Sequence, residues 1–560
     1  MMKYGHPCAS GRGAGVRVSV RWHAYRSDPE TGEPMSNENS RESGVSRREF
    51  IGSATLTTAG VATGLSFYYM RPKAPDLSFY RNPENQVRLG YIGIGNRGMS
   101  LLRSSLQVPG NRPIAVADVR RSQRDEAIND IKNTMARDGV AEYAIKSHDD
   151  YRRVLDDKDV EAVFIATPHY LHAPMALDAL DAGKHVYCEK AMAYTIGENQ
   201  DLYDRIAGGA KAADGSLTVF QVGHQRHYAP LYRRVDSMIN EEGVIGDIAA
   251  IRAQWNDNDT GRRACPDPDL EKVINWRLYS EFSAGLTSEY ASHQIDVANW
   301  LLGTHPDSVC GFGGVDWYND GRDTQDNIHL IFNYKVPVLD RDAYGRAKKD
   351  ANGKWVHKME GNRTVTRNVR FDYMSLLENK HLGASEMILG TYGSIEISLQ
   401  GGGEFFKEAK SLADPNRIAE GTNPRQSKQK KILKTGSTVD PNQASIRRAK
   451  GDPIYAAKDR DGWVEARKHW VNYTTPIPGS YDTHETLLAI GSYLDCIRRS
   501  RRGEDFKDEL KANVEIGLWG AVPALMANLA MREERTVYWN EFFPAMDTAS
   551  LPPKGEREQG

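Results

Sequence analysis

The sequence predicts an α/β domain built on a parallel sheet, followed by an α+β domain with an open, mostly antiparallel sheet. Three observations lead to this fold class: the length of the chain, a change of residue pattern after residue 86, and a second change after residue 226. At 560 residues the chain exceeds what a single core usually organises, so two domains with additional segments are expected. The expected divisions are a leader (1–80), a first domain (86–225), a second domain (226–545) and a polar tail (546–560).

Short apolar runs alternate with helix-length segments in the first domain. Because enough residues for a helix separate each pair of strands, right-handed crossovers and a parallel sheet are expected. The runs are continuously apolar, which is typical of strands buried on both faces. They are Val87–Ile92, Ile114–Ala117, Val160–Ala166, His185–Cys188 and Leu217–Val222.

The second domain has longer strands in which apolar and polar residues tend to alternate. That pattern predicts a sheet with one face on the core and the other in solvent. The predicted elements are strands Ile248–Trp255, Asn327–Tyr334, Val365–Tyr373 and Ser394–Leu399, helices Thr483–Arg499 and Leu510–Met531, and a short strand Val537–Trp539. Two polar stretches, near 337–363 and 401–480, are predicted to be insertions.

Charge and cysteine content exclude several classes of function. Lys and Arg number 73 against 75 for Asp and Glu, so the chain has no field of one sign to attract nucleic acid, and no nucleic-acid partner is expected. The five cysteines include no C-x-x-C pair, so neither a disulfide framework nor a metal site is predicted. One chance bridge, Cys265 to Cys310, stays open for an exported chain.

Paired arginines precede a mildly apolar run in the leader. The segment S-R-R-E-F-I at 46–51, followed by the run 52–70, resembles a twin-arginine export signal. The run is too rich in Gly and Thr for a convincing membrane span. We therefore expect the twin-arginine export machinery as a partner and a periplasmic or exported protein, tethered to the membrane if the signal stays uncleaved. The alternative is a surface helix whose first turn carries two arginines.

A glycine-rich turn joins the first predicted strand to a helix. Glycine is needed there because the chain turns tightly and its backbone must approach a pyrophosphate at a helix N-terminus. The motif has the form G-x-G-x-x-G, and the residues expected to bind a dinucleotide are Gly93, Gly95, Asn96, Arg97 and Gly98.

An aspartate follows the glycine motif at the spacing that dinucleotide-binding domains use. Asp118 lies twenty positions after Gly98, at the end of the next strand, where its carboxylate can accept hydrogen bonds from ribose hydroxyls. Together the two features predict a Rossmann domain that binds NAD. Arg120 and Arg121 lie just beyond and can pair with a 2′-phosphate, so NADP stays possible.

Two further motifs follow later strands of the first domain. They are T-P-H-Y-L-H at 167–172 and G-K-H-V-Y-C-E-K-A at 183–191. The pattern is similar to the nicotinamide-side signature of the glucose-fructose oxidoreductase and inositol dehydrogenase (Gfo/Idh/MocA) family, with Ala191 where that family usually has proline. The resemblance implies cofactor contacts from Thr167, Pro168, His172, Glu189 and Lys190. It also implies that Lys190 contacts the substrate hydroxyl, where a cation would stabilise a developing alkoxide.

The third motif is a predicted helix with three polar residues on one face. Glu289, His293 and Asp296 stand at i, i+4 and i+7, so a carboxylate is expected to orient the imidazole. The segment resembles the family's D-x-x-x-H-x-x-D helix, with Glu289 in place of the first aspartate. The resemblance implies that these three residues are catalytic and that His293 is the general base.

The motifs together predict an oxidoreductase that transfers a hydride between a hydroxyl-bearing carbon of a sugar or polyol and a tightly bound nicotinamide cofactor. Arg226, Trp276 and Arg277 are expected to line the sugar site. Two alternatives stay open: a redox-neutral, NAD-dependent glycoside hydrolase of the same family, and a cofactor-binding regulator without catalysis. A homo-oligomer is expected, because open sheets of this kind commonly pair.

Overall fold

The computed structural model describes residues 82–265, 267–340, 348–350, 355–398, 402–407 and 481–544. The leader with its twin-arginine signal lies outside the described residues, as do the polar tail (546–560), Cys8 and most of the insertion predicted at 401–480. The described cysteines Cys188, Cys265, Cys310 and Cys496 are free, so the bridge left open between Cys265 and Cys310 is not formed.

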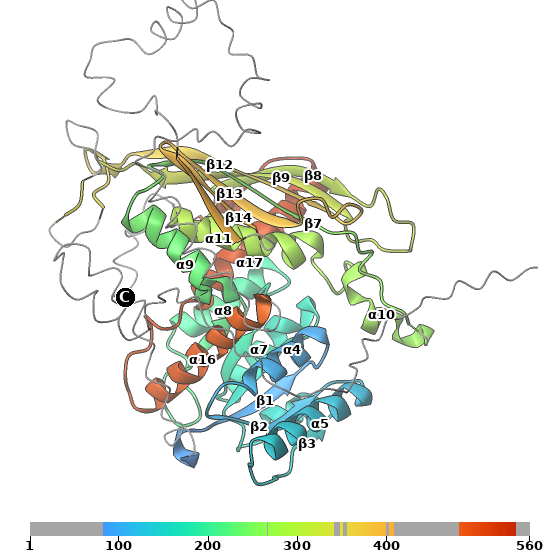
Figure 1. Cartoon of the computed structure of the whole chain (residues 1–560). Helices are drawn as coiled ribbons and strands as arrows, with labels where there is room; N and C mark the ends of the chain where they lie inside the picture. The colour runs from blue at the N-terminus through green and yellow to red at the C-terminus, as the bar shows by residue number, and fades with distance from the viewer. Residues whose placement is uncertain are drawn as a thin grey trace, which may run out of the picture. The chain divides into compact units, whose positions relative to one another are not determined.

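Six parallel strands form the sheet of the first domain, as the continuous apolar runs predict (Figure 1). They lie in the order β3-β2-β1-β4-β5-β6, so the order reverses beside β1, and ligands of such sheets bind at the carboxyl ends of the strands near this point. The short β3 is mostly exposed and has no apolar pattern, so the sequence did not reveal it. The strands are β1 (Val87–Ile92), β2 (Asn111–Ala117), β3 (Lys146–His148), β4 (Ala162–Ile165), β5 (His185–Cys188) and β6 (Phe220–Val222).

Helices cover both faces of this sheet. One face packs in a core with α4, α5 and α16, and the other with α6, α7 and α8. The helices are α4 (Asn96–Ser105), α5 (Arg121–Arg137), α6 (Arg152–Leu155), α7 (His172–Asp181), α8 (Ile196–Ala207) and α16 (Tyr481–Arg501), with 3-10 turns η1 (Pro83–Asn85), η2 (His169–Leu171) and η3 (Gln225–Tyr228).

Helix α16 belongs with the first sheet, although its position in the sequence suggested the second domain. Its buried residues, including Ile490, Tyr493 and Leu494, share a core with β1 and α4. The Tyr493 ring meets Phe164 of β4 edge-on at 5.6 Å between centroids. The chain therefore returns to the first domain after the second sheet is complete.

Eight strands form the sheet of the second domain, which is mostly antiparallel as predicted. β7 and β12 are the parallel pair. Alternate residues along β9 and β12 are buried and exposed, because one face lies on the core. In sheet order the strands are β15 (Gly402–Lys407), β14 (Gly393–Ser398), β13 (Ala384–Gly390), β7 (Ile248–Asn256), β12 (Thr366–Leu376), β9 (Asn327–Pro337), β8 (Ser308–Gly314) and β16 (Val537–Tyr538).

Parts of the two predicted insertions have regular structure. The first contains the small hairpin β10 (Met359–Glu360) and β11 (Arg363–Thr364), and the described start of the second is β15 at the sheet edge. The remaining helical elements of the second domain are α9 (Pro230–Asp236), η4 (Ser237–Glu241), η5 (Pro268–Leu270), α10 (Glu271–Ile274), η6 (Trp276–Leu278), η7 (Thr287–Ala291), α11 (Ser292–Leu302), α17 (Val514–Glu533) and η8 (Trp539–Glu541).

Helices α11 and α17 lie against one face of the second sheet (Figure 1). Among the described residues, α17 is the one helix that is long and apolar enough to cross a membrane. However, 67% of its most apolar window is buried inside the fold. It also contacts α8 and β6 of the first domain. These contacts make α17 a core helix shared by the two domains.

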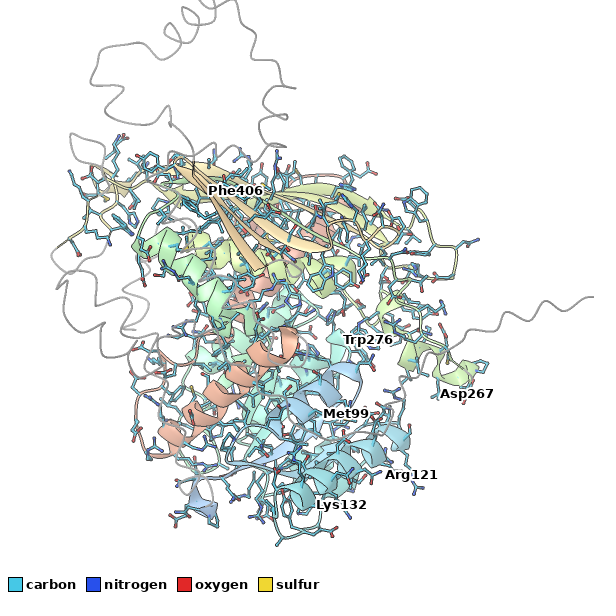
Figure 2. All side chains as sticks on the ribbon, viewed as in Figure 1. Met99, Arg121, Lys132, Asp267, Trp276 and Phe406 are labelled. Carbon is cyan, nitrogen blue, oxygen red and sulfur yellow. The ribbon has the colours of Figure 1, made fainter. Side chains whose placement is uncertain are left out.

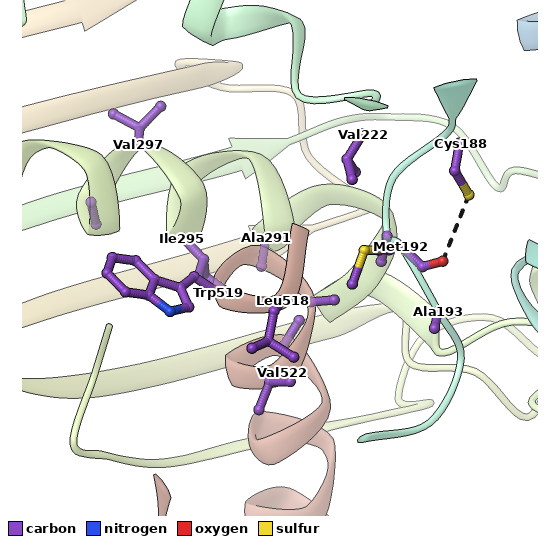
Figure 3. Close-up of a cluster of buried hydrophobic side chains, with 14 of the residues drawn as sticks. Cys188, Met192, Ala193, Val222, Ala291, Ile295, Val297, Leu518, Trp519 and Val522 are labelled. Atoms are coloured by element: carbon purple, nitrogen blue, oxygen red, sulfur yellow. Dashed lines mark hydrogen bonds between the residues drawn. The ribbon is translucent and has the colours of Figure 1, made fainter. Parts of the chain in front are cut away.

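A continuous apolar cluster joins the two domains next to the ends of β5 and β6. Figure 3 shows Met192 and Val222 facing Leu518 of α17, with Ala291 and Ile295 of the η7–α11 segment beside them. A Cβ added to Gly517 would lie 2.6 Å from Met192 Sδ and Val222 Cγ2, so the backbones approach closely here. This packing fixes the chain around residue 190 relative to the helix that carries His293.

Candidate functional site

The glycine turn between β1 and α4 has the geometry that the motif predicts. Gly93 has φ +83°, which side-chain-bearing residues rarely adopt, and a Cβ on Gly98 would lie 1.9 Å from Gly93 O. A Cβ on Gly95 would meet nothing within 4 Å, because this residue faces an open cavity at the N-terminus of α4. Gly98 therefore closes the turn, while Gly95 leaves space for a ligand.

Asp118 lies at the end of β2 beside the glycine turn. Its carboxylate accepts hydrogen bonds from Ile94 N (2.7 Å) and Arg120 N (2.8 Å), and Arg120 Nε lies 3.7 Å away. Asp118 and Arg120 both line the cavity. The Arg121 side chain is 85% exposed, pairs with Asp125 and does not line the cavity. The glycine turn and this carboxylate fit the pyrophosphate and ribose of a dinucleotide.

The cavity has a volume of about 470 Å³ and extends from the glycine turn to the second domain. Of the predicted site residues it is lined by Gly93, Gly95, Asn96, Arg97, Asp118, Thr167, Pro168, His172, Glu189, Lys190, Trp276, Arg277, Glu289 and His293. Gly98, Arg226 and Asp296 do not line it. Residues that are far apart in the sequence therefore surround one space.

Glu189 and Lys190 follow β5 and are held by different partners. Arg97 Nε donates to Glu189 Oε1 at 2.7 Å. The Lys190 ammonium donates to Glu289 O at 2.6 Å and to Ser288 O at 3.4 Å, so it bridges to the η7 turn of the second domain. The Lys190–Ala191 peptide bond is cis. Burial lowers the pKa of Lys190 from its usual value.

His172 links the loops that follow β4 and β5. Its ring nitrogens lie 2.8 Å from Thr167 O and 2.8 Å from Ala191 O, and the side chain is buried. Burial lowers the pKa of His172, and a neutral ring has one N–H, so it donates to one of these two carbonyl oxygens. The histidine of the T-P-x-x-x-H motif thus positions the backbone on either side of the cavity.

The structure corrects the expected arrangement of the third motif. Glu289 lies in a π-helical turn, η7, and α-helical geometry begins only at Ser292. Its carboxylate lies 3.1 Å from His169 Nε2 and accepts a 3.1 Å hydrogen bond from Arg277 Nε, and no described contact joins it to His293. The wider turn changes the angle between positions 289 and 293, so the i, i+4 relation expected for an α-helix does not hold.

Asp296 also has partners other than His293. Its carboxylate receives a 2.9 Å hydrogen bond from His227 Nε2 and lies 3.4 Å from His224 Nδ1, and all three side chains are buried. The physical reason is that two histidines of the link between the domains face this side of α11. Asp296 is therefore placed behind the cavity, outside its lining.

His293 itself reaches the cavity, as the motif predicts. Its ring lies 5.3 Å from the Trp255 ring, centroid to centroid, and the residue is only 8% exposed. Burial lowers the pKa of His293 well below its usual value, and the positive charge of Lys190 lowers it further. The imidazole is therefore neutral at neutral pH.

The three residues expected at the sugar site separate into two groups. Trp276, labelled in Figure 2, and Arg277 line the cavity from η6, and the Arg277 guanidinium lies 4.2 Å from the Trp276 ring centroid. Arg226 is buried instead, and its Nη1 lies 2.5 Å from Glu386 Oε1. It is a buried partner of that carboxylate, not a cavity residue.

His169 is a site residue that the sequence reasoning missed. Its Nδ1 accepts from Ala284 N at 3.4 Å, so Nε2 carries the proton and faces Glu289. Burial lowers the pKa of His169 to about 3, so the ring is neutral. It occupies an unspecified position of the T-P-x-x-x-H motif, and its only sequence signal was its place directly after a β-strand end.

Comparison with known proteins identifies both domains. Residues 87–212 match the family described as "Oxidoreductase family, NAD-binding Rossmann fold", and residues 232–339 match the "GFO/IDH/MocA C-terminal domain". Both matched segments are similar to domains of Gfo/Idh/MocA oxidoreductases. The first domain of the chain is an NAD-binding Rossmann domain, as the glycine turn and Asp118 predict.

Individual relatives of this family resemble parts of the chain. A levoglucosan dehydrogenase of Pseudarthrobacter phenanthrenivorans is 33% identical over 158 residues, which are 28% of this chain and 37% of the relative. A glycosyl hydrolase family 109 protein of Saccharopolyspora erythraea is 34% identical over 180 residues, which are 30% and 38% of the two chains. The matched segments thus span less than half of these relatives. A solved structure of levoglucosan dehydrogenase with NADH and levoglucosan aligns with 81% of this chain and 99% of its own, at 18% identity and a TM-score of 0.49.

Proposed function

We propose that the protein is an NAD-dependent oxidoreductase acting on a CH–OH group of a sugar or polyol. The observation that carries the proposal is a single cavity lined by the glycine turn of one domain and by Lys190 and His293 beyond it. Relatives in this family include a levoglucosan dehydrogenase, which supports a sugar-like substrate.

His293 accepts the hydroxyl proton in this proposal. At neutral pH its neutral imidazole has one unprotonated nitrogen, whose lone pair can accept a proton, as a general base requires. As the O–H bond breaks, the C–H bond of the same carbon breaks too, and its electron pair leaves as hydride. When bound, the nicotinamide supplies the hydride acceptor.

Lys190 stabilises the oxygen that loses this proton. An ammonium has three N–H donors, and the described residues accept two of them at Ser288 O and Glu289 O. The third donor is available for the substrate oxygen. Because the ammonium is fixed before the reaction, it stabilises a developing alkoxide without reorganising.

The dinucleotide is held, in this proposal, by the first domain. The N-terminus of α4 and Gly95 receive the pyrophosphate, and Asp118 receives the ribose hydroxyls. Glu189, fixed by Arg97, borders the nicotinamide end. A 2′-phosphate would meet the Asp118 carboxylate, so NAD is preferred over NADP.

The test begins with mass spectrometry of the dinucleotide released from the purified full-length protein. NADH formation is then followed by absorbance with a panel of neutral and acidic sugars and polyols. Bound NAD and NADH formation that His293→Asn abolishes would support the proposal. A protein that neither contains nor binds NAD or NADP on titration would overturn it.

A second candidate is a redox-neutral, NAD-dependent glycoside hydrolase, which the 34% identity to a family 109 glycosyl hydrolase favours. The same base and cation would then act on a sugar that is oxidised and reduced within one turnover. Release of an aglycone from a chromogenic glycoside without accumulation of NADH would favour the hydrolase. Net NADH from a free polyol would favour the dehydrogenase.

We also propose export by the twin-arginine route, on the basis of Arg47 and Arg48 before an apolar run. Because that route carries folded proteins, the cofactor would be loaded before export and retained tightly. Replacing both arginines with lysine should leave the protein in the cytoplasm, as fractionation would show. Exclusively cytoplasmic wild-type protein would refute export.

A homo-oligomer is proposed from the solvent face of the second sheet. Phe312 on β8 is 78% exposed and Ile331 on β9 is 48% exposed, and Trp317, which follows β8, is 69% exposed. Large exposed apolar side chains of this kind commonly mark contact surfaces. Light scattering after size exclusion measures the mass, and a monomer at micromolar concentration would contradict this proposal.

A further inference from the structure

The substrate end of the cavity carries one more positive than negative charge. Lys190 and Arg277 are its cations and Glu289 its carboxylate, because His169 and His293 are neutral. Lys190 is already accounted for by the proposed proton transfer. Arg277 is the second cation. Its Nε is paired with Glu289, and the proposed chemistry gives its Nη groups no role.

The cations outside the substrate end of the cavity also have carboxylate partners. Arg97 pairs with Glu189 at 2.7 Å, Arg120 lies 3.7 Å from Asp118, and Lys272 pairs with Glu281 at 2.8 Å. The exposed Asp149 follows β3, which is the neighbour of β2, and so lies at the Asp118 end. The uncompensated positive charge is therefore confined to the substrate end.

Two contacts fix the Arg277 guanidinium. Its Nε donates to Glu289 Oε2 at 3.1 Å, and its Cζ lies over the Trp276 ring, 4.2 Å from the ring centroid. The His169 ring meets Trp276 edge-on at 5.3 Å, which supports the indole from another side. These contacts position the arginine before a ligand arrives, so little side-chain entropy remains to be lost.

The free edge of Arg277 faces a space that a ligand can enter. Among the described residues none accepts a hydrogen bond from Nη1 or Nη2, although the side chain is only 48% exposed and lines the cavity. Two parallel N–H groups on a planar fork match the two oxygens of a carboxylate. A single hydroxyl would use only one of them.

Trp276 does not offer an open stacking face on the side of Arg277. The sequence predicts Trp276 at the sugar site, but the Arg277 guanidinium covers this face of the indole. Trp276 and Arg277 together therefore present a positive charge, and not an open aromatic face, to the cavity. This changes the class of ligand that the site favours.

We propose that the substrate is an acidic sugar or polyol, whose carboxylate binds the Nη edge of Arg277 while one of its hydroxyls lies between Lys190 and His293. This inference rests on the proposed dehydrogenase function and names its substrate class. Glu289 is the positioning residue that holds Arg277 in place.

The test compares matched pairs of ligands that differ in one carboxylate. D-Glucuronate is compared with D-glucose, D-galacturonate with D-galactose, and D-gluconate with sorbitol. Binding to the NADH-loaded full-length protein is measured by calorimetry, and oxidation is measured separately as NADH formation with NAD. Binding and turnover are thereby scored independently.

The variant Arg277→Gln removes the charge, and Arg277→Lys keeps the charge but removes the fork. Arg263→Gln is the matched control, because Arg263 is also half-exposed, pairs with one carboxylate at 3.1 Å and does not line the cavity. Arg277→Gln should weaken binding of the preferred acid about 10- to 150-fold, the range for hydrogen bonds to charged groups. Arg277→Lys should lose less, and Arg263→Gln should match the wild type.

Each outcome separates this inference from the proposed function. Arg277-dependent binding of an acid without NADH formation would support the acidic site and contradict the dehydrogenase. Oxidation of neutral sugars with equal efficiency in the wild type and Arg277→Gln would leave the dehydrogenase standing and overturn the acidic site. Failure of every acid in the panel to bind at millimolar concentration would also overturn it.

Discussion

The buried pair of Arg226 and Glu386 allows a structural role to be separated from substrate binding. Arg226 Nη1 lies 2.5 Å from Glu386 Oε1, and Tyr232 donates to Glu386 Oε2 at 3.0 Å. The two charged side chains are 5% and 3% exposed. A second buried carboxylate, Glu485, also acts on the charge of Arg226. Arg226 therefore has two negative neighbours in a site that excludes water.

The expected cost of breaking the pair follows from this charge count. Removing one partner of a buried ion pair costs about 3–5 kcal/mol, because the other charge stays buried without compensation. Arg226→Met leaves two carboxylates and should reach the upper end of that range. Glu386→Gln leaves the arginine with Glu485 and keeps an acceptor for Tyr232, so it should cost about 3 kcal/mol or less. The double variant Arg226→Met/Glu386→Met should cost less than Arg226→Met alone.

Urea unfolding, followed by circular dichroism and by tryptophan fluorescence, measures these free energies where the two transitions coincide. The dissociation constant for the preferred sugar is measured on each folded variant. A structural Arg226 predicts that the double variant binds the sugar as the wild type does. If Arg226→Met unfolded within about 1 kcal/mol of the wild type yet bound the sugar at least tenfold more weakly, the structural account would be wrong.

Three further predictions concern the cavity. Gly98→Ala should lower the unfolding free energy of the first domain by at least about 1–3 kcal/mol, because its Cβ would lie 1.9 Å from Gly93 O. Gly95→Ala should leave the unfolding free energy nearly unchanged but weaken NADH binding, which fluorescence measures. His293→Asn should lower kcat about 10²- to 10⁴-fold with an unchanged NADH dissociation constant, and a loss of NADH binding would show a structural role instead. Burial lowers the pKa of His293, and the positive charge of Lys190 lowers it further. Because only the neutral ring accepts a proton, kcat/KM should stay constant as the pH falls through 6.5 and should decline only at lower pH. A decline centred at or above pH 6.5 would contradict a buried base.

The sequence predicted the first domain well because its signals are local. A continuous apolar run between helix-length segments implies a buried parallel strand, and five strands of the first sheet follow that rule. The glycine turn is equally local, since Gly93 is required by its positive φ and Gly98 by the close approach of Gly93 O. The strand β3 was missed because an edge strand of three polar residues carries no apolar pattern.

Tertiary pairing was beyond what local patterns convey. Helix α16 follows the second sheet in sequence, but its residues Ile490 and Tyr493 pack on the first sheet. The apolar pattern of a helix predicts that one face is buried, but it does not predict which sheet that face covers. The partners of Asp296 are likewise distant, since His227 lies 69 positions earlier. A spacing of i, i+7 identifies a shared helix face but not the side chains that another segment brings to it.

The π-helical turn explains how the third motif departs from its α-helical expectation and still contributes to the cavity. In η7 the amide of Ser292 bonds to Thr287 O, five residues back, and the helix becomes α-helical only from Ser292 onward. An α-helix would have aligned Glu289 with His293. In the widened turn the Glu289 side chain faces His169 and Arg277 while its carbonyl oxygen accepts from Lys190 at 2.6 Å. One residue thereby fixes the ammonium through its backbone and the guanidinium through its carboxylate. Among the residues that the structure describes, no carboxylate pairs with His293. Because a paired carboxylate would raise the pKa of the imidazole, its absence is consistent with a ring that stays neutral and able to accept a proton.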